Sequence, residues 1–312
     1  MTHSHSHSHL GEIAGKTTSR LALSLGLTLV FVLIEAAAGY FSNSLVLLTD
    51  AAHNVTDVLA LGISWYAIRL TARPSNPRQT YGYHRAGILA ALINSTTLVV
   101  IALGILFEAY QRLVSPPEVR AGILVAIGIL ALVINLATAL LVRKGSEHDL
   151  NLRSAFVHLM GDVLSTIGAV IAGIVIYFTG WNWLDPFVSA LIALMILWSA
   201  WMILRETVDI LLEATPRDVD MDAMVRDIVQ VPGVLGVHDL HVWSITRGLR
   251  TMSAHILTDD VPISMGTSIQ AQVNERLAHD YHIAHATLQL ECVGCNLDAL
   301  YCDIEAIHQH SD

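Results

Sequence analysis

Six long apolar segments follow one another along the first two thirds of the chain, with short polar connections between them. Each has about 20 residues or more, the length that a helix needs to cross the hydrocarbon core of a bilayer. The second and fifth segments are the least apolar, because ionisable residues stand in their interiors. The pattern predicts six transmembrane helices, over residues 21–41, 45–69, 86–110, 121–142, 153–178 and 184–204.

After the sixth apolar segment the pattern changes to shorter elements, typical of a small water-exposed domain. Helical periodicity and strand-like alternation follow each other there, and Arg247-Gly248 separates two strand-like stretches in the manner of a hairpin turn. The expected elements are a helix at 220–231, strands at 234–245 and 251–258, a helix at 264–279 and a strand at 286–291. The second part of the chain is therefore predicted to be an α/β domain.

Composition and charge support this division. Hydrophobic residues make up 54% of the chain and charged residues only 14%, against roughly 25% in soluble domains. The first 205 residues carry 12 Lys and Arg and 10 Asp and Glu, whereas residues 206–312 carry 5 and 17. An acidic tail disfavours nucleic acid or an anionic lipid surface as its partner and suits a cation.

Basic residues also indicate how the chain is oriented in the bilayer. They gather before the first predicted span and in the connections between spans two and three and between spans four and five. The connections on the other side hold only Arg112 and Arg120. Because basic connections stay in the cytoplasm, both termini are expected there, which requires an even number of spans.

A repeated motif stands inside two of the predicted spans. His53 and Asp57 are four residues apart in the second span, and His158 and Asp162 have the same spacing in the fifth. Residues four apart share one face of a helix, so two such faces offer two imidazole nitrogens and two carboxylates. This is a complete tetrahedral ligand set for Zn²⁺, and its carboxylates neutralise the charge of the ion.

The alternative is that these polar side chains only hold helices together, as isolated polar residues in membranes often do. Two carboxylates in mid-membrane cost about 2.5–3.5 kcal/mol each even on a lenient scale, which favours a functional site. Zinc binds neutral imidazole and ionised carboxylate, so protons compete with it. The hypothesis that follows is zinc loading from the cytoplasm and release outside by protons.

With these residues the chain resembles the cation diffusion facilitator family, and within it the bacterial exporters of zinc, cadmium and cobalt. The resemblance covers nearly the whole chain and includes further motifs. They are Ser44-Leu45 leading to Asp50, Tyr81-Gly82-Tyr83, Asp185-Pro186 and His238-Asp-Leu-His241-Val-Trp243. It implies a proton-coupled exporter of Zn²⁺, with Cd²⁺ and Co²⁺ as further substrates, working as a homodimer in a bacterial inner membrane.

The resemblance also implies a ferredoxin-like tail that binds a regulatory Zn²⁺ ion. The matching tail positions are His238, His255, His285 and Glu291. Some relatives carry another site between the second and third spans, but only His84 is available there, one place from the expected position. We therefore expect that additional site to be absent or degenerate.

Weaker metal signals stand at the two ends of the chain. All three cysteines lie in the last 21 residues, which is a poor disulfide framework and fits free thiols in a reducing compartment. Cys292 and Cys295 form a two-thiol hook, which is half a zinc shell or a pair of free thiols. The His-Ser repeat at residues 3–9 is either a mobile metal-collecting arm or part of an expression tag.

The expected organisation has four parts, and transport is weighed against two other functions. The parts are a His-rich arm at 1–20, a transmembrane domain at 21–210, a metal-binding and dimerisation domain at 211–292, and a Cys/His tail at 293–312. An intramembrane metalloenzyme needs an open coordination position and often a His-Glu-x-x-His motif, which the chain lacks. A membrane-anchored metal sensor would need one span, not six with buried carboxylates.

Overall fold

The computed structural model describes residues 29–143 and 150–292, which form two compact units. Residues 1–28, 144–149 and 293–312 lie outside the described part. The His-rich arm and the last Cys/His residues fall in these ranges. Among the described residues, one unit comprises 29–65, 93–143 and 150–203, and the other 66–92 and 204–292. We call the long helices up to Leu211 the helical unit and the elements after Leu211 the tail unit.

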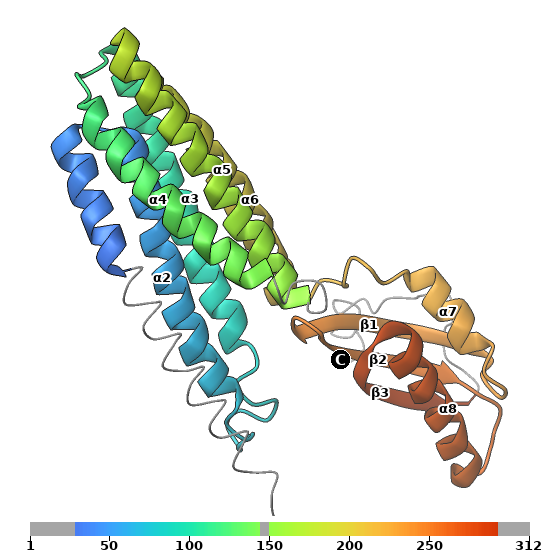
Figure 1. The fold of residues 1–312 in the computed structure, drawn as a ribbon. Coiled ribbons are helices and arrows are strands. Elements are labelled where there is room, and N and C mark those ends of the chain that lie inside the picture. The colour runs from blue at the N-terminus through green and yellow to red at the C-terminus, as the bar shows by residue number, and fades with distance from the viewer. Residues whose placement is uncertain (1–28, 144–149, 293–312) are drawn as a thin grey trace, which may run out of the picture. The chain divides into compact units, whose positions relative to one another are not determined.

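Long helices form at the predicted apolar segments, with nearly the expected limits (Figure 1). A helix over Leu29–Ser42 comes first, and residues 21–28 of the expected first span are not described. The next five helices are α2 (Leu45–Thr71), α3 (Ala86–Val114), α4 (Ala121–Arg143), α5 (Leu150–Thr179) and α6 (Leu184–Leu211).

Four of the described helices are long and apolar enough to cross a membrane: α3, α6 and the segments Ala121–Leu140 and Leu159–Thr179. The α2 helix is continuous over 27 residues, but polar side chains, among them Asp50, His53 and Asp57, interrupt its apolar sequence. Length and apolarity thus identify four spans in the described residues, and the first two predicted spans do not meet both criteria there.

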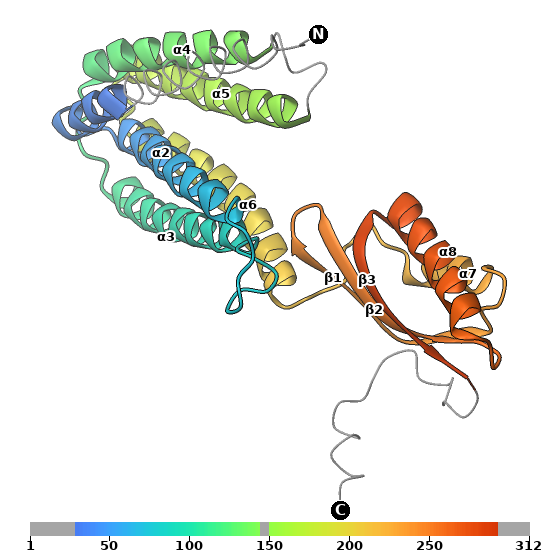
Figure 2. The same ribbon diagram turned by 90° about the horizontal axis from the view of Figure 1, so that it is seen from below.

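The α4 and α5 helices lie side by side in both views (Figures 1 and 2). Glycines allow this close approach: a Cβ on Gly128 would lie 2.9 Å from Val170, and one on Gly173 would lie 2.9 Å from Leu124. Asn135 of α4 adds a hydrogen bond from its amide to Thr166 Oγ1 of α5, 3.1 Å away. The two helices therefore form a tightly packed pair.

A buried carboxylate of α6 fixes the start of α2. Asp185 accepts hydrogen bonds from the Ser44 hydroxyl and the Leu45 backbone N–H, both at 2.6 Å, and a longer one from Val46 N at 3.4 Å. Asp185 and Ser44 are fully buried. The first N–H groups of a helix have no partner within the helix, and a carboxylate also suits its positive end. Asp185 thus caps α2 from a helix 140 residues further along the chain.

The tail unit contains a three-stranded mixed sheet with both of its helices on one face (Figure 2). Its elements are α7 (Met221–Val229), β1 (Gly236–Thr246), β2 (Leu249–Leu257), α8 (Ile263–Tyr281) and β3 (Ile283–Glu291). The predicted order of elements is confirmed, as is the hairpin at Gly248, where φ is +83°. Strand β1 pairs antiparallel with β2, and α8 carries the chain back so that β3 runs parallel to β2.

The two faces of this sheet differ in chemistry. Apolar side chains of one face, among them Met252 and Ile256 of β2, pack against α7 and α8. The helices contribute Met224, Val273 and Leu277 to this core. The opposite face, called the outer face below, carries His238 of β1 and its partner His255 of β2. Strand alternation therefore separates the core of the tail from its candidate metal ligands.

Replacing Asp185 with alanine should destabilise the helical unit. The change leaves the Ser44 hydroxyl and two backbone N–H groups buried without their acceptor, at a cost of about 1–3 kcal/mol. Thermal unfolding of the full-length protein in detergent should show a lower midpoint. Asp209→Ala is the control, because it removes only a surface ion pair with Arg217 and should change the midpoint little. Equal midpoints for the two variants would contradict the capping role.

Candidate metal centres

Three side chains of the repeated motif meet inside the helical unit. His53 and Asp57 lie one turn apart on α2, and Asp162 approaches them from α5. The Nε2 atom of His53 is 3.6 Å from Asp57 Oδ2 and 3.4 Å from Asp162 Oδ1. The exposed fractions of the three side chains are 15%, 29% and 13%, so the group is largely shielded but not sealed.

These distances suit ligands of a single metal ion. Zinc binds imidazole nitrogen and carboxylate oxygen at about 2.0–2.2 Å, so two ligands at tetrahedral angles lie roughly 3.3–3.6 Å apart. Both separations from His53 Nε2 fall in this range. The donor set fits zinc without a large movement of the described side chains.

The helix backbone around the site is held by hydroxyl groups one turn away. Thr56 donates to the carbonyl of His53 at 2.6 Å, and Thr166 and Ser165 donate to the carbonyl of Asp162 at 2.7 and 2.9 Å. Thr166 is also the residue that Asn135 contacts from α4. The position of Asp162 is therefore tied to the α4–α5 pair.

The fourth predicted ligand, His158, lies on α5 four residues before Asp162. Its side chain lies outside the part of the chain that the structure describes. The structure thus brings together three of the four residues predicted for this site and leaves the fourth as a prediction.

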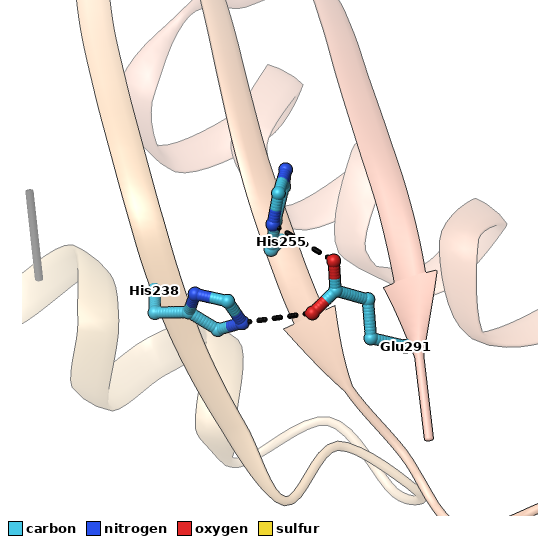
Figure 3. A group of neighbouring side chains, drawn as sticks. All are labelled: His238, His255 and Glu291. Carbon is cyan, nitrogen blue, oxygen red and sulfur yellow. Dashed lines mark hydrogen bonds and ion pairs between the residues drawn. The ribbon is translucent and has the colours of Figure 1, made fainter. Parts of the chain in front are cut away.

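A second group of candidate ligands lies on the outer face of the tail sheet (Figure 3). It consists of His238 on β1, His255 on β2 and Glu291 at the end of β3, with one ligand atom from each within 4.8 Å of the others. Glu291 bridges the two imidazoles, 3.1 Å from Nε2 of His238 and 2.9 Å from Nδ1 of His255. Adjacent strands bring these distant residues together, because His238 and His255 are direct partners in the sheet.

An irregularity in β1 adds a carboxylate that the sequence reasoning missed. The register between β1 and β2 shifts between His238 and His241, and Asp239 there has a φ of +49°. Its carboxylate lies 3.4 Å from Nε2 of His255 and 3.0 Å from Nε2 of His241. A positive φ at a bulge redirects side chains, and nothing in the alternation of the strand marks Asp239 in advance.

The other predicted tail ligands do not join this group in the described residues. His285 is exposed on β3, six residues before Glu291, and strand geometry separates the two by about 20 Å. Cys292 is exposed directly after β3. Cys295 lies outside the described residues.

Two family models match consecutive parts of the chain. One is described as the cation efflux transmembrane domain and matches residues 21–212. The other is described as the cation efflux protein cytoplasmic domain and matches residues 216–293. Their common border falls between α6 and α7, where the long helices give way to the tail unit.

Similar proteins of known name match over nearly the whole chain. Zinc transporter ZitB of Escherichia coli is 38% identical over 300 residues, covering 95% of this chain and 94% of that protein. The cadmium, cobalt and zinc/H⁺-K⁺ antiporter of Bacillus subtilis is 37% identical, covering 92% and 94%. The metal cation efflux system protein CzcD of Cupriavidus metallidurans is 36% identical, covering 93% and 90%.

A solved structure of the metal-bound C-terminal domain of the CzcD transporter is also similar in sequence. It is 32% identical over 23% of this chain and 99% of that one, with a TM-score of 0.22. Together the two matched domains span the long helices and the tail. The chain therefore belongs to the cation efflux family of integral membrane transporters, and it is not an enzyme.

Proposed function

We propose that the protein exports Zn²⁺ from the cytoplasm in exchange for protons, through a tetrahedral site made of His53, Asp57, His158 and Asp162. The observation that carries the proposal is the position of His53 Nε2, at ligand-to-ligand distance from carboxylates on two different helices. A site shared between α2 and α5 opens and closes when these helices move against each other. Two carboxylates balance the charge of the ion, which lowers the free-energy cost of moving it away from water.

The same geometry serves the proton-loaded state. A protonated His53 would lie between Asp57 and Asp162 and form ion pairs with both, at the distances given above. Zinc and protons thus compete for one set of side chains that satisfies either. Imidazole titrates near neutral pH, so a modest proton gradient acts on this competition.

The names of the relatives support the choice of ions. One relative is named a zinc transporter, and another is named an antiporter of cadmium, cobalt and zinc with H⁺ and K⁺. Imidazole and carboxylate ligands without a thiolate suit zinc and cobalt, and they bind several divalent metals in one general order. We infer that zinc is the main substrate and that Cd²⁺ and Co²⁺ are further substrates.

We further propose the predicted topology and organisation. Six spans within residues 21–210 place both termini in the cytoplasm of a bacterium, with the protein in the inner membrane. The basic connections support this orientation. Residues 1–20 then form a cytoplasmic His-rich arm, and residues 293–312 a short tail with Cys and His ligands.

The tail group is proposed to bind a regulatory zinc ion. His238, His255 and Glu291 supply two nitrogens and one oxygen. Asp239 contacts the other ring nitrogen of His255, so it orients this imidazole and is not itself a ligand of the same ion. The matched cytoplasmic domain supports a homodimer that forms through the tail. Zinc on the outer face would then link cytoplasmic zinc concentration to the state of the dimer.

Asp162→Ala should abolish zinc transport by removing the ligand that α5 contributes opposite His53. The loss should be at least about 100-fold, because loss of a mere supporting contact costs roughly 10–100-fold. The measurement uses purified protein in vesicles that hold a zinc-sensitive and a pH-sensitive dye.

The control is Glu108→Gln, an acidic residue of α3 that pairs with Arg112. It should transport as the wild type does, with protons moving against zinc. Normal transport by Asp162→Ala would contradict the proposed site. Proton flux in the same direction as zinc would contradict the proposed exchange.

His255→Ala should remove the tail ion while leaving the membrane site intact. Because His255 contacts both Glu291 and Asp239, its loss should weaken tail zinc binding by at least about 100-fold. Competition of the full-length protein with a zinc indicator counts the tight sites. His279→Ala is the matched control, an exposed histidine of α8 bonded to Asp280. If His279→Ala also had one tight zinc site fewer than the wild type, the assignment of the tail site to His255 would be refuted.

A further inference from the structure

A second pair of carboxylates lies in the helical unit, separate from the proposed metal ligands. Glu35 belongs to the helix over Leu29–Ser42, and Asp50 lies on α2, three residues before His53. Their exposed fractions are 0% and 5%. The amide of Asn54 lies between them and donates to Glu35 Oε2 at 3.3 Å and to Asp50 Oδ2 at 3.4 Å.

Neither Glu35 nor Asp50 has a basic side chain within ion-pair distance among the described residues. The Oε1 atom of Glu35 is buried without any hydrogen-bond partner there. Two ionised carboxylates that share one neutral amide, away from water, would carry a large electrostatic cost.

A proton relieves this cost better than a metal ion does. One proton between two carboxyl groups removes a negative charge and supplies the missing donor. A metal ion at the same place would face the N–H groups of Asn54, whose positive ends already point at both carboxylates. The pair also contains no imidazole or thiol to hold zinc or a similar metal.

We propose that Glu35 and Asp50 together bind one proton, and that zinc entering the neighbouring site expels it. This inference rests on the proposed zinc–proton exchange and adds a carrier for one of its protons. Asp50 lies three residues before His53 on α2, which is close to one helical turn, and Asp162 approaches His53 from α5. A divalent ion beside Asp50 therefore favours the ionised form of the pair.

The coupling works in both directions. If zinc lowers the affinity of the pair for its proton, then the proton lowers the affinity of the site for zinc by the same factor. The groups that set this balance are Asp50 and Asn54, which contact each other and Glu35 from α2, and His53 and Asp162 beyond them. Glu35 itself stays off the metal and acts only through the charge of the pair.

The test counts the protons released when zinc binds to the full-length protein in detergent. Calorimetric titration in two buffers with different ionisation enthalpies gives this number. Subtracting the result for Asp162→Ala removes the zinc that binds in the tail or at the chain ends. Glu35→Gln should release about one proton fewer per zinc than the wild type, because glutamine keeps the contact with Asn54 but cannot ionise.

Asp50→Asn should also release about one proton fewer per zinc than the wild type. The double variant should again release about one fewer, not two, because the two carboxylates share a single proton. Glu108→Gln should release as many protons as the wild type. Unchanged proton release in both single variants would overturn the proposal. So would loss of zinc binding in both, which would mean that the pair only supports the fold. Equal titrations of the wild type and Asp162→Ala would instead contradict the proposed transport site itself, and the coupling with it.

Discussion

The cost of holding carboxylates away from water is the constraint on which the helical unit depends. His53 lowers this cost for Asp57 and Asp162, and in the proposed cycle zinc and protons do so in turn. Asp185 meets it with the hydroxyl and N–H groups at the start of α2. In the described part of the chain, Glu35 and Asp50 share the amide of Asn54 and have no ion pair. In the proposed cycle, Asp185 therefore holds the fold, while the other two pairs of carboxylates exchange ions.

Both kinds of acid lie on α2 or contact it. The Asp185 cap anchors the beginning of α2, and His53 and Asp57 follow two to three turns later. A helix that is fixed at its start by Asp185 and contacted at its middle by Asp162 holds the candidate metal site at the second of these contacts. The proposed proton pair lies between the anchor and this site, so that charge changes at one reach the other over a short distance in a medium of low dielectric constant.

The candidate metal ligands of the tail are placed by strand pairing, on one face of a sheet, and not by helix packing. Strand pairing places His238 beside His255, and the end of β3 brings Glu291 against both. Six residues of β3 separate His285 from Glu291, and extended backbone does not fold back on itself within that length. Resemblance alone grouped His285 with the others, and it did not include Asp239, which a backbone irregularity turns towards His255.

The sequence by itself determined the long helices, the order of the tail elements and the pairing of His and Asp at a four-residue spacing, because periodicity and local spacing are properties of neighbouring residues. The repeated spacing also predicted that Asp162 would meet His53. Only the tertiary structure decided which other distant groups meet, because no local pattern placed Asp185 at the start of α2, Glu35 beside Asn54 or Asp239 beside His255. Such contacts depend on how helices pack and where a strand bulges, and these are set by many side chains together and not by any local pattern.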